Sequence, residues 1–168
     1  MVMTYLLYKK NYASSNDPII GQIKKQKISL FHPFLPYEEK SLQLFLLRLY
    51  FVILSLGKFW IFYCNDKENN LVHTSYVVHS RIKFPFIQKN GFEIGPCFTA
   101  EFFRGQGIYR NVLKKITSDK TFQGCSFFMI VDDNNIPSKK GIVASGFEQV
   151  GFVKKTFAKI YRIANENI

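Results

Sequence analysis

The sequence predicts a single mixed α/β domain in which helices flank a central β-sheet. Three observations indicate this class. The chain has 168 residues, which is the length of one ordinary domain. Its content of 47% hydrophobic and 17% aromatic residues is enough to build a core. Short strand-like apolar segments alternate along the chain with segments of helical pattern, an order typical of a mixed α/β sheet.

The first third of the chain contains a lead-in segment and one long apolar helix. Residues 1–36 include three prolines, so we expect an irregular or partly helical segment packed on the domain formed by residues 37–168. From Glu38 the pattern predicts a helix that is buried on several sides and closed by Gly57. Whether the apolar stretch 41–56 packs within one chain or against a second copy in a homodimer stays open.

The remaining elements alternate between strands and helices. A hairpin is expected over residues 58–80, because the aromatic segment KFWIFYC and the segment LVHTSYVVHS flank a polar turn. Residues 92–100, FEIGPCFTA, predict the next strand, and a glycine-rich turn joins it to a helix over residues 108–118. A buried strand, a helix beginning near residue 136 and two closing strands complete the expected sheet.

Charge, cysteine content and hydropathy exclude several classes of protein. The net charge of +11 comes from basic residues spread over the whole chain, which is typical of a solvated surface and secondarily of steering toward polyanionic ligands. The widely spaced Cys64, Cys97 and Cys125 form no zinc or disulfide pattern, so we expect no metal and a cytoplasmic protein. Arg48 and Lys58 bound an apolar run about half as long as the ~20 residues of a transmembrane helix, so we expect no membrane span.

The most informative segment is the glycine-rich turn before the helix at 108–118. Gly105 and Gly107 allow successive backbone N–H groups to point into one small cavity, and the helix adds the positive end of its dipole. Pyrophosphate fits such a site. The turn lacks the lysine of a P-loop and the spacing of a dinucleotide-binding motif. By itself, a turn of this kind also fits a purely geometric role.

Two motifs resemble those of the GNAT acetyltransferase family. Residues 104–109, RGQGIY, resemble the first motif, Q/R-x-x-G-x-G/A, and follow a strand as that family requires. Asn135 and Ser138, with the Gly-Phe pair at 146–147, resemble the second motif, in which an asparagine opens a helix that ends in Gly-Phe. The resemblance covers roughly residues 58–163. It implies a largely antiparallel sheet splayed at an acetyl-CoA site, and transfer of the acetyl group to an amine.

The resemblance also implies which residues contact the coenzyme. The turn would hold the pyrophosphate with backbone N–H groups, the preceding strand would pair with the pantetheine arm, and the second motif would contact the coenzyme from its helix. The residues so implied are Cys97, Phe98, Thr99, Arg104, Gly105, Gln106, Gly107, Ile108, Tyr109, Asn135 and Ser138. Two positions depart from the family pattern. Tyr109 replaces a small residue, and Ile142 replaces a tyrosine that protonates the departing thiolate in many members.

The sequence offers three candidates for the base that deprotonates the amine. Glu93 is the leading one, because strand alternation would place it on one face with Cys97 and Thr99; a solvated strand start is the alternative. His73 and His79 share a face of the neighbouring hairpin strand, and each also fits a structural role. Cys97 has no histidine–acid pairing in sequence, which favours direct transfer over an acetyl-enzyme.

The acceptor remains open among several classes. The chain looks similar to GNAT members encoded with bacterial polysaccharide genes, which acetylate nucleotide-linked amino sugars. Arg81, Lys83, Phe84 and Phe86 would then bind the diphosphate and stack on the base, although a surface loop with a packed phenylalanine is the alternative. A protein, peptide or small-amine acetyltransferase is a second interpretation. A phosphate-binding nucleic-acid module is a third, but no nucleic-acid signature is present and we expect no such partner.

Overall fold

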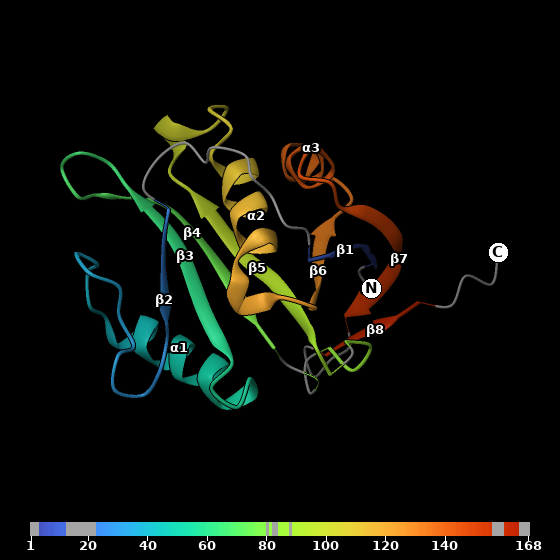
Figure 1. The fold of residues 1–168 in the computed structure, drawn as a ribbon, viewed down its shortest axis with the longest axis horizontal. Helices are drawn as coiled ribbons and strands as arrows, with labels where there is room; N and C mark the ends of the chain where they lie inside the picture. Colours follow the sequence, from blue (N-terminus) through green and yellow to red (C-terminus); the bar gives the residue numbers. More distant parts are fainter. Residues whose placement is uncertain are drawn as a thin grey trace.

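One mixed sheet organises the described part of the chain, which comprises residues 4–12, 23–79, 81, 84–87, 89–155 and 160–164 of this computed structural model. Its strands are β1 Thr4–Asn11, β2 Lys24–Lys27, β3 Phe59–Asn65, β4 Leu71–Val78, β5 Gly91–Thr99, β6 Ser126–Asp132, β7 Glu148–Lys155 and β8 Tyr161–Ile163. Their order is β2-β3-β4-β5-β6-β1-β7-β8 (Figure 1). Only β5 and β6 pair in parallel among these eight described strands. The predicted mixed, largely antiparallel sheet is confirmed.

The helices cover both faces of this sheet. They are α1 Leu42–Leu54, α2 Ile108–Ser118 and α3 Ile136–Ala144. Phe62 of β3 packs in one core cluster with Leu113 of α2 and Ile142 of α3, whereas the adjacent Ile61 packs in a second cluster with Phe51 of α1. Successive strand residues point to opposite faces, so α2 and α3 cover one face, the α2/α3 face, and α1 covers the other, the α1 face.

The N-terminal segment is a central strand instead of an irregular lead-in. β1 lies between β6 and β7 and is antiparallel to both; Leu6 pairs with Val131 on one side and Phe152 on the other. The expectation for this segment is therefore wrong over β1 and over the edge strand β2. It failed because breaker residues near Pro18, outside the described residues, dominated the local pattern. The pairing that makes β1 a strand comes from segments more than 100 residues away.

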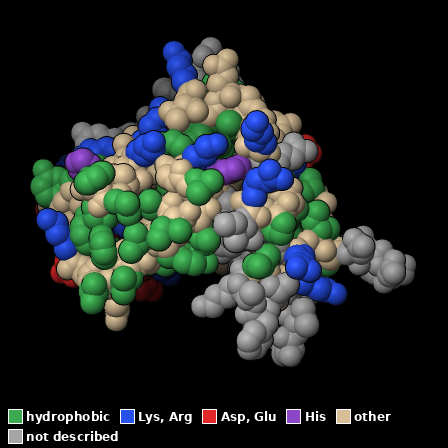
Figure 2. Space-filling view, turned by 90° about the horizontal axis from the view of Figure 1, so that it is seen from below, with side chains coloured by type: hydrophobic (Ala, Val, Ile, Leu, Met, Phe, Trp, Pro, Cys, Tyr) green, Lys and Arg blue, Asp and Glu red, His purple; other side chains and the backbone are tan. Residues whose placement is uncertain are grey.

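The outer side of α1 is apolar and exposed. Leu42, Leu46, Tyr50 and Ile53 recur at helical spacing and face solvent, and Figure 2 shows hydrophobic side chains gathered over this helix. The expected burial on several sides is wrong, because α1 packs on the sheet through one side only. None of the helices in the described residues is long and apolar enough to cross a membrane.

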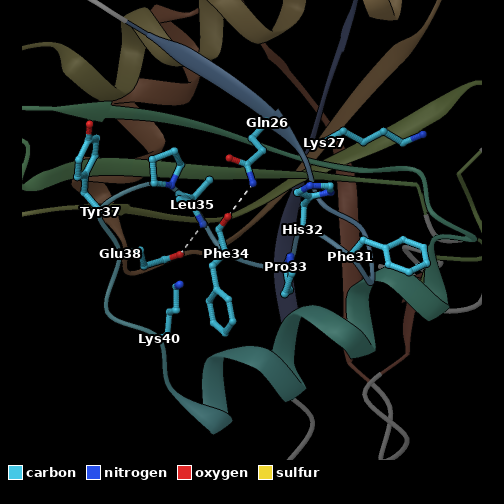
Figure 3. Close-up of a pocket in the computed structure, with 11 residues that line it drawn as sticks. Gln26, Lys27, Phe31, His32, Pro33, Phe34, Leu35, Tyr37, Glu38 and Lys40 are labelled. Carbon is cyan, nitrogen blue, oxygen red and sulfur yellow. Dashed lines mark hydrogen bonds between the residues drawn. The ribbon is translucent and has the colours of Figure 1, made fainter.

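A strap formed by residues 28–40 joins β2 to α1. With β2 it lines a cavity of about 560 Å³ (Figure 3). Gln26 of β2 donates from Nε2 to the Phe34 carbonyl at 2.7 Å, which attaches the strap to the sheet edge. This cavity lies over the edge strand β2, and β3 and β4 separate β2 from β5 in the sheet.

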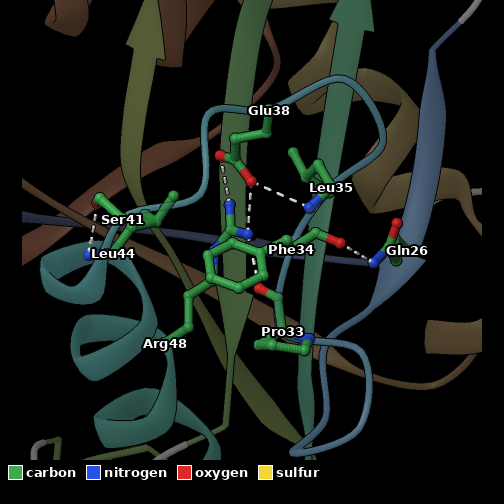
Figure 4. Close-up of polar contacts among 8 residues, drawn as sticks. All are labelled: Gln26, Pro33, Phe34, Leu35, Glu38, Ser41, Leu44 and Arg48. Atoms are coloured by element: carbon green, nitrogen blue, oxygen red, sulfur yellow. Dashed lines mark hydrogen bonds and ion pairs between the residues drawn. The ribbon is translucent and has the colours of Figure 1, made fainter.

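A buried ion pair attaches the strap to α1, and a serine cap marks where the helix begins. Arg48 is fully buried, and its guanidinium donates to the Glu38 carboxylate in two hydrogen bonds of 2.6 and 2.7 Å (Figure 4). It also donates to the Pro33 carbonyl at 2.6 Å. The helix expected from Glu38 begins later, at Leu42, because the Ser41 hydroxyl accepts from the Leu44 N–H as the N-cap.

Candidate functional site

β5 and β6 separate in the middle of the sheet. They pair at three positions, from Gly91 opposite Ser126 to Glu93 opposite Phe128. Beyond Glu93, the residues of β5 pair with β4 alone among the described strands. One edge of residues 97–99 is thus left facing the gap, and the splayed sheet that the resemblance implied is confirmed.

A slot of about 410 Å³ occupies the gap and passes through the sheet. Its lining includes Leu47 and Phe51 from α1, and Ser138 and Ile142 from α3. Since these helices lie on opposite faces of the sheet, the slot is lined from both faces. Glu93 lines it at the point where the two strands diverge. The arrangement allows two ligands to approach one point from opposite faces.

A bulge in β5 places Glu93 on the α1 face. Val77 of β4 pairs with Ile94, but Ser75 pairs with Cys97, so β5 has one extra residue between these pairs. Ile94 packs in the core of the α2/α3 face, and the adjacent Glu93 therefore points to the α1 face. Cys97 packs against the α2/α3 core after the bulge. The prediction that Glu93 shares a face with Cys97 and Thr99 is wrong, because the bulge resets the alternation.

The Glu93 carboxylate is almost enclosed and closely packed. Its residue is 7% exposed. A Cβ added at Gly95 would lie 2.6 Å from its Oε1, which is closer than real contacts allow. Glycine at position 95 therefore leaves the room in which the carboxylate lies.

The glycine-rich turn has the geometry of an anion site. Gly105 and Gly107 have φ angles of 77° and 76°, in the left-handed region that favours glycine. α2 begins directly after Gly107, and no described side chain caps its first turn, so its N–H groups are open to an anion. The Arg104 side chain donates to the Thr99 carbonyl at 3.1 Å and braces the turn against the end of β5. Gln106 donates to the Phe102 carbonyl, also at 3.1 Å.

The second motif has the shape expected from the resemblance. Asn135 is the N-cap of α3, and its Oδ1 accepts from the Ser138 N–H at 3.2 Å. The helix is followed by Gly146, with a φ of 82°, and by the buried Phe147. Asn135 and Ser138 both line the slot, and so does Ile142, the residue that stands in place of the family's tyrosine.

The Tyr109 side chain points into the same slot from α2. Its hydroxyl lies 3.4 Å from the Ser138 Oγ. An added Cβ at Gly141 would lie 2.6 Å from the tyrosine ring, so this glycine makes room for it. Burial raises the pKa of Tyr109, which keeps the phenol protonated. Sequence reasoning placed the backbone N–H of Tyr109 among the coenzyme contacts and noted its side chain only as a departure from the motif. The glycine at position 141, which makes room for the ring, is the sequence feature that goes with its position.

The two histidine candidates lie outside the lining of the slot. His73 is fully buried; its Nδ1 is 2.7 Å from the Thr99 Oγ1 and its Nε2 is 2.8 Å from the Ser75 Oγ. Burial lowers the pKa of His73 to about 4, so the ring is neutral at pH 7. The Nδ1 of His79 lies 2.6 Å from the carbonyl oxygen of Gly91. Both rings brace β5 against its neighbour.

The Cys97 thiol has the character of a packing group. The Ser75 hydroxyl donates to its sulfur at 3.2 Å. Burial raises the pKa of Cys97 to about 12, and the charge of Glu93 acts in the same direction. A thiolate nucleophile is therefore disfavoured at neutral pH.

The loop expected to hold a nucleotide is only partly available. Phe84 is 1% exposed and packs with Leu7 and Phe128, so it cannot stack on a base. Phe86 packs edge-on against Phe84 and Phe128. Arg81 is exposed, and Lys83 lies outside the described residues. The alternative prediction, a surface loop with a packed phenylalanine, fits Phe84. The packed ring also lines the slot.

No group of three or more histidine, cysteine, aspartate or glutamate side chains in the described residues is arranged to hold an ion.

Several solved structures resemble this arrangement of strands and helices. A GNAT-family acetyltransferase from Colwellia psychrerythraea superposes with a TM-score of 0.59 at 17% identity, covering 88% of this chain and 53% of its own. The chain has the GNAT fold. A second structure assigned to the GNAT acetyltransferases, from Novosphingobium aromaticivorans, has a TM-score of 0.60 at 12% identity and covers 92% of this chain and 63% of its own.

A third neighbour is a conserved protein of unknown function from Staphylococcus epidermidis, with a TM-score of 0.51 at 13% identity, covering 90% of this chain and 60% of its own. This chain thus spans between half and two thirds of the length of the three neighbours. No family model matches the sequence, and no curated protein matches it.

Proposed function

We propose that this chain is an acetyl-CoA-dependent N-acetyltransferase that moves the acetyl group directly to a primary amine. The observation that carries the proposal is the slot that crosses the sheet where β5 and β6 diverge. The glycine-rich turn, which has the geometry of an anion site, adjoins the slot through Tyr109. The Glu93 carboxylate lines the slot from the opposite, α1 face. An anion-binding module would need only the turn. The GNAT fold of the neighbours supports the same reaction class.

In this proposal the coenzyme enters from the α2/α3 face. The N–H groups of residues 105–109 hold the pyrophosphate, and the unpaired edge of residues 97–99 pairs with the pantetheine arm. Asn135 and Ser138 border the arm from α3. Arg104 holds the turn against β5 through the Thr99 carbonyl.

The acceptor amine approaches from the α1 face and meets the thioester inside the slot. Its nitrogen attacks the thioester carbon while the Glu93 carboxylate takes the proton, and a backbone N–H of β5 stabilises the oxyanion. The carbon–sulfur bond then breaks. Tyr109 donates a hydrogen bond to the departing sulfur, a role left vacant by Ile142.

The identity of the acceptor is a separate question. An amino-sugar nucleotide for surface polysaccharide synthesis is one candidate, supported by the net charge of +11 and by the exposed Arg81. The buried Phe84 removes one of the stacking contacts on which it depended. Protein, peptide and small-molecule amines are the other candidates.

Amine-dependent release of thiol from acetyl-CoA tests the reaction, and two glycine variants test the site. Gly105→Val places a β-branched residue at a φ of 77° in the turn; Gly124→Val does the same at 76° far from it, and both positions are open to an added Cβ. We expect Gly105→Val to weaken acetyl-CoA binding at least tenfold, which is about 1.4 kcal/mol, and Gly124→Val to bind normally. Equal binding by both variants would contradict the assignment.

A further inference from the structure

The mouth of the slot on the α1 face is apolar. Leu47 and Phe51 line it from α1, and Phe84 lines it from the loop before β5. No lysine, arginine or histidine of the described residues lines the slot, although the chain carries a net charge of +11. The carboxylates in the lining are those of Glu93 and Asp132. The described lining therefore has no cationic side chain to bind the phosphate of a nucleotide. Its two carboxylates are few for binding a polyamine.

The apolar surface continues from the mouth along α1. Leu47 is 43% exposed and lines the slot, so it offers a side chain to a ligand there, whereas the adjacent Leu46 is 53% exposed and lies outside the lining. Figure 2 shows this hydrophobic area over the helix. The one charged residue of α1, Arg48, points inward and is neutralised by Glu38 (Figure 4). The helix beside the mouth therefore presents no charge to solvent.

We propose, resting on the proposed function, that the acceptor is a primary amine joined to an alkyl or aryl body that lies against Leu47, at the mouth that Phe51 and Phe84 border. The body gains by leaving water, and the amine reaches the Glu93 carboxylate inside the slot. The neutral amine is the nucleophile, and the Glu93 carboxylate takes the proton that the amine loses. The mouth thus selects the body of the substrate.

An amine series with acetyl-CoA measures this preference. The probes are n-butylamine, n-hexylamine, n-octylamine and 2-phenylethylamine, compared with ethanolamine, spermidine and a uridine-diphosphate-linked amino sugar. We expect kcat/KM to rise about fourfold per methylene while the chain is being buried, and the polar amines to be the poorest substrates. A flat alkyl series, or preference for the sugar nucleotide, would overturn the inference.

A pair of neighbouring variants locates the effect at the mouth. Leu47→Gln adds polarity in the lining, and Leu46→Gln adds it to the adjacent, more exposed residue that does not line the slot. We expect Leu47→Gln to lower kcat/KM for n-octylamine about tenfold, the loss of one to two buried methylenes, and to lower it much less for ethanolamine, which has almost no apolar body to bury. Leu46→Gln should retain the wild-type alkyl preference, and equal losses in both variants would overturn the inference.

Binding of acetyl-CoA distinguishes a failure of this inference from a failure of the proposed function. Wild-type protein that binds acetyl-CoA and acetylates an amine without alkyl preference contradicts the inference alone. Wild-type protein that does not bind acetyl-CoA contradicts both.

Discussion

The two ends of the slot differ in how they are built. At the α2/α3 end, the site comes from two short motifs. The turn that ends at Gly107 supplies backbone N–H groups, and Asn135 caps α3. At the α1 end, Leu47, Phe84 and Glu93 come from three separate segments. The first end is built mainly from backbone groups of local turns, which suits a phosphate-bearing coenzyme. The second is built from side chains that only the fold brings together, and we infer that it determines the acceptor.

Replacing the carboxylate at the α1 end should separate chemistry from coenzyme binding. Glu93→Gln keeps the shape and removes the base, so we expect turnover to fall by about 10²-fold or more. Acetyl-CoA affinity should be unchanged, because the coenzyme is held at the other end. Glu101→Gln, at an exposed glutamate beside the turn, is the control. Steady-state rates and calorimetry give both readouts, and unchanged turnover would remove Glu93 as the base.

A smaller change beside the same carboxylate should act in the same direction. A Cβ at Gly95 would lie 2.6 Å from the Glu93 Oε1, so Gly95→Ala must displace the carboxylate. We expect kcat to fall by about tenfold, the order of loss that a misplaced catalytic group brings. Gly151 has a φ of 156°, close to the 154° of Gly95, and open space around an added Cβ, so Gly151→Ala is a matched control. Equal kcat in both variants would show that the position of the carboxylate is unimportant.

At the α2/α3 end, the tyrosine hydroxyl should matter less than the carboxylate. Tyr109→Phe keeps the ring against Gly141 and removes the hydrogen bond to the departing sulfur. A thiolate leaves without much help, so we expect kcat to fall by about threefold to tenfold, the worth of one hydrogen bond. The acetyl-CoA Kd should change little. A loss as large as that of Glu93→Gln would remove the proposed difference between the two ends.

The brace beneath the coenzyme end should be visible in stability and not in catalysis. The pKa of His73 is lowered from 6.5 to about 4, so the unfolded state binds its proton first as the pH falls. Stability contributed by the neutral ring is present above pH 6.5 and is lost toward pH 4, with a slope of up to about 1.4 kcal/mol per pH unit. The free energy of unfolding, measured with urea across this pH range, should depend less steeply on pH in His73→Gln than in His32→Gln, a change at an exposed histidine. Identical slopes would contradict the buried, neutral assignment.

The same contrast explains what could be predicted from the sequence. The mixed sheet, the hairpin, α2 and the shape of both motifs depend on local patterns, and the structure confirms them. The position of β1 depends on pairing with β6 and β7, far away in the chain, and no local pattern carries that information. The face of Glu93 depends on a bulge that one extra residue in β5 creates. The place of Leu47 in the slot depends on how the Arg48–Glu38 ion pair and the sheet together orient α1.

The most direct test of the account is a calorimetric titration of the full chain with acetyl-CoA, with AMP as the comparison ligand. The account predicts saturable binding at one site, much tighter than that of AMP, because the slot holds the pantetheine arm in addition to the phosphates. Absence of saturable binding, or an affinity no greater than that of AMP, would contradict it and would leave the turn as a feature of the fold alone.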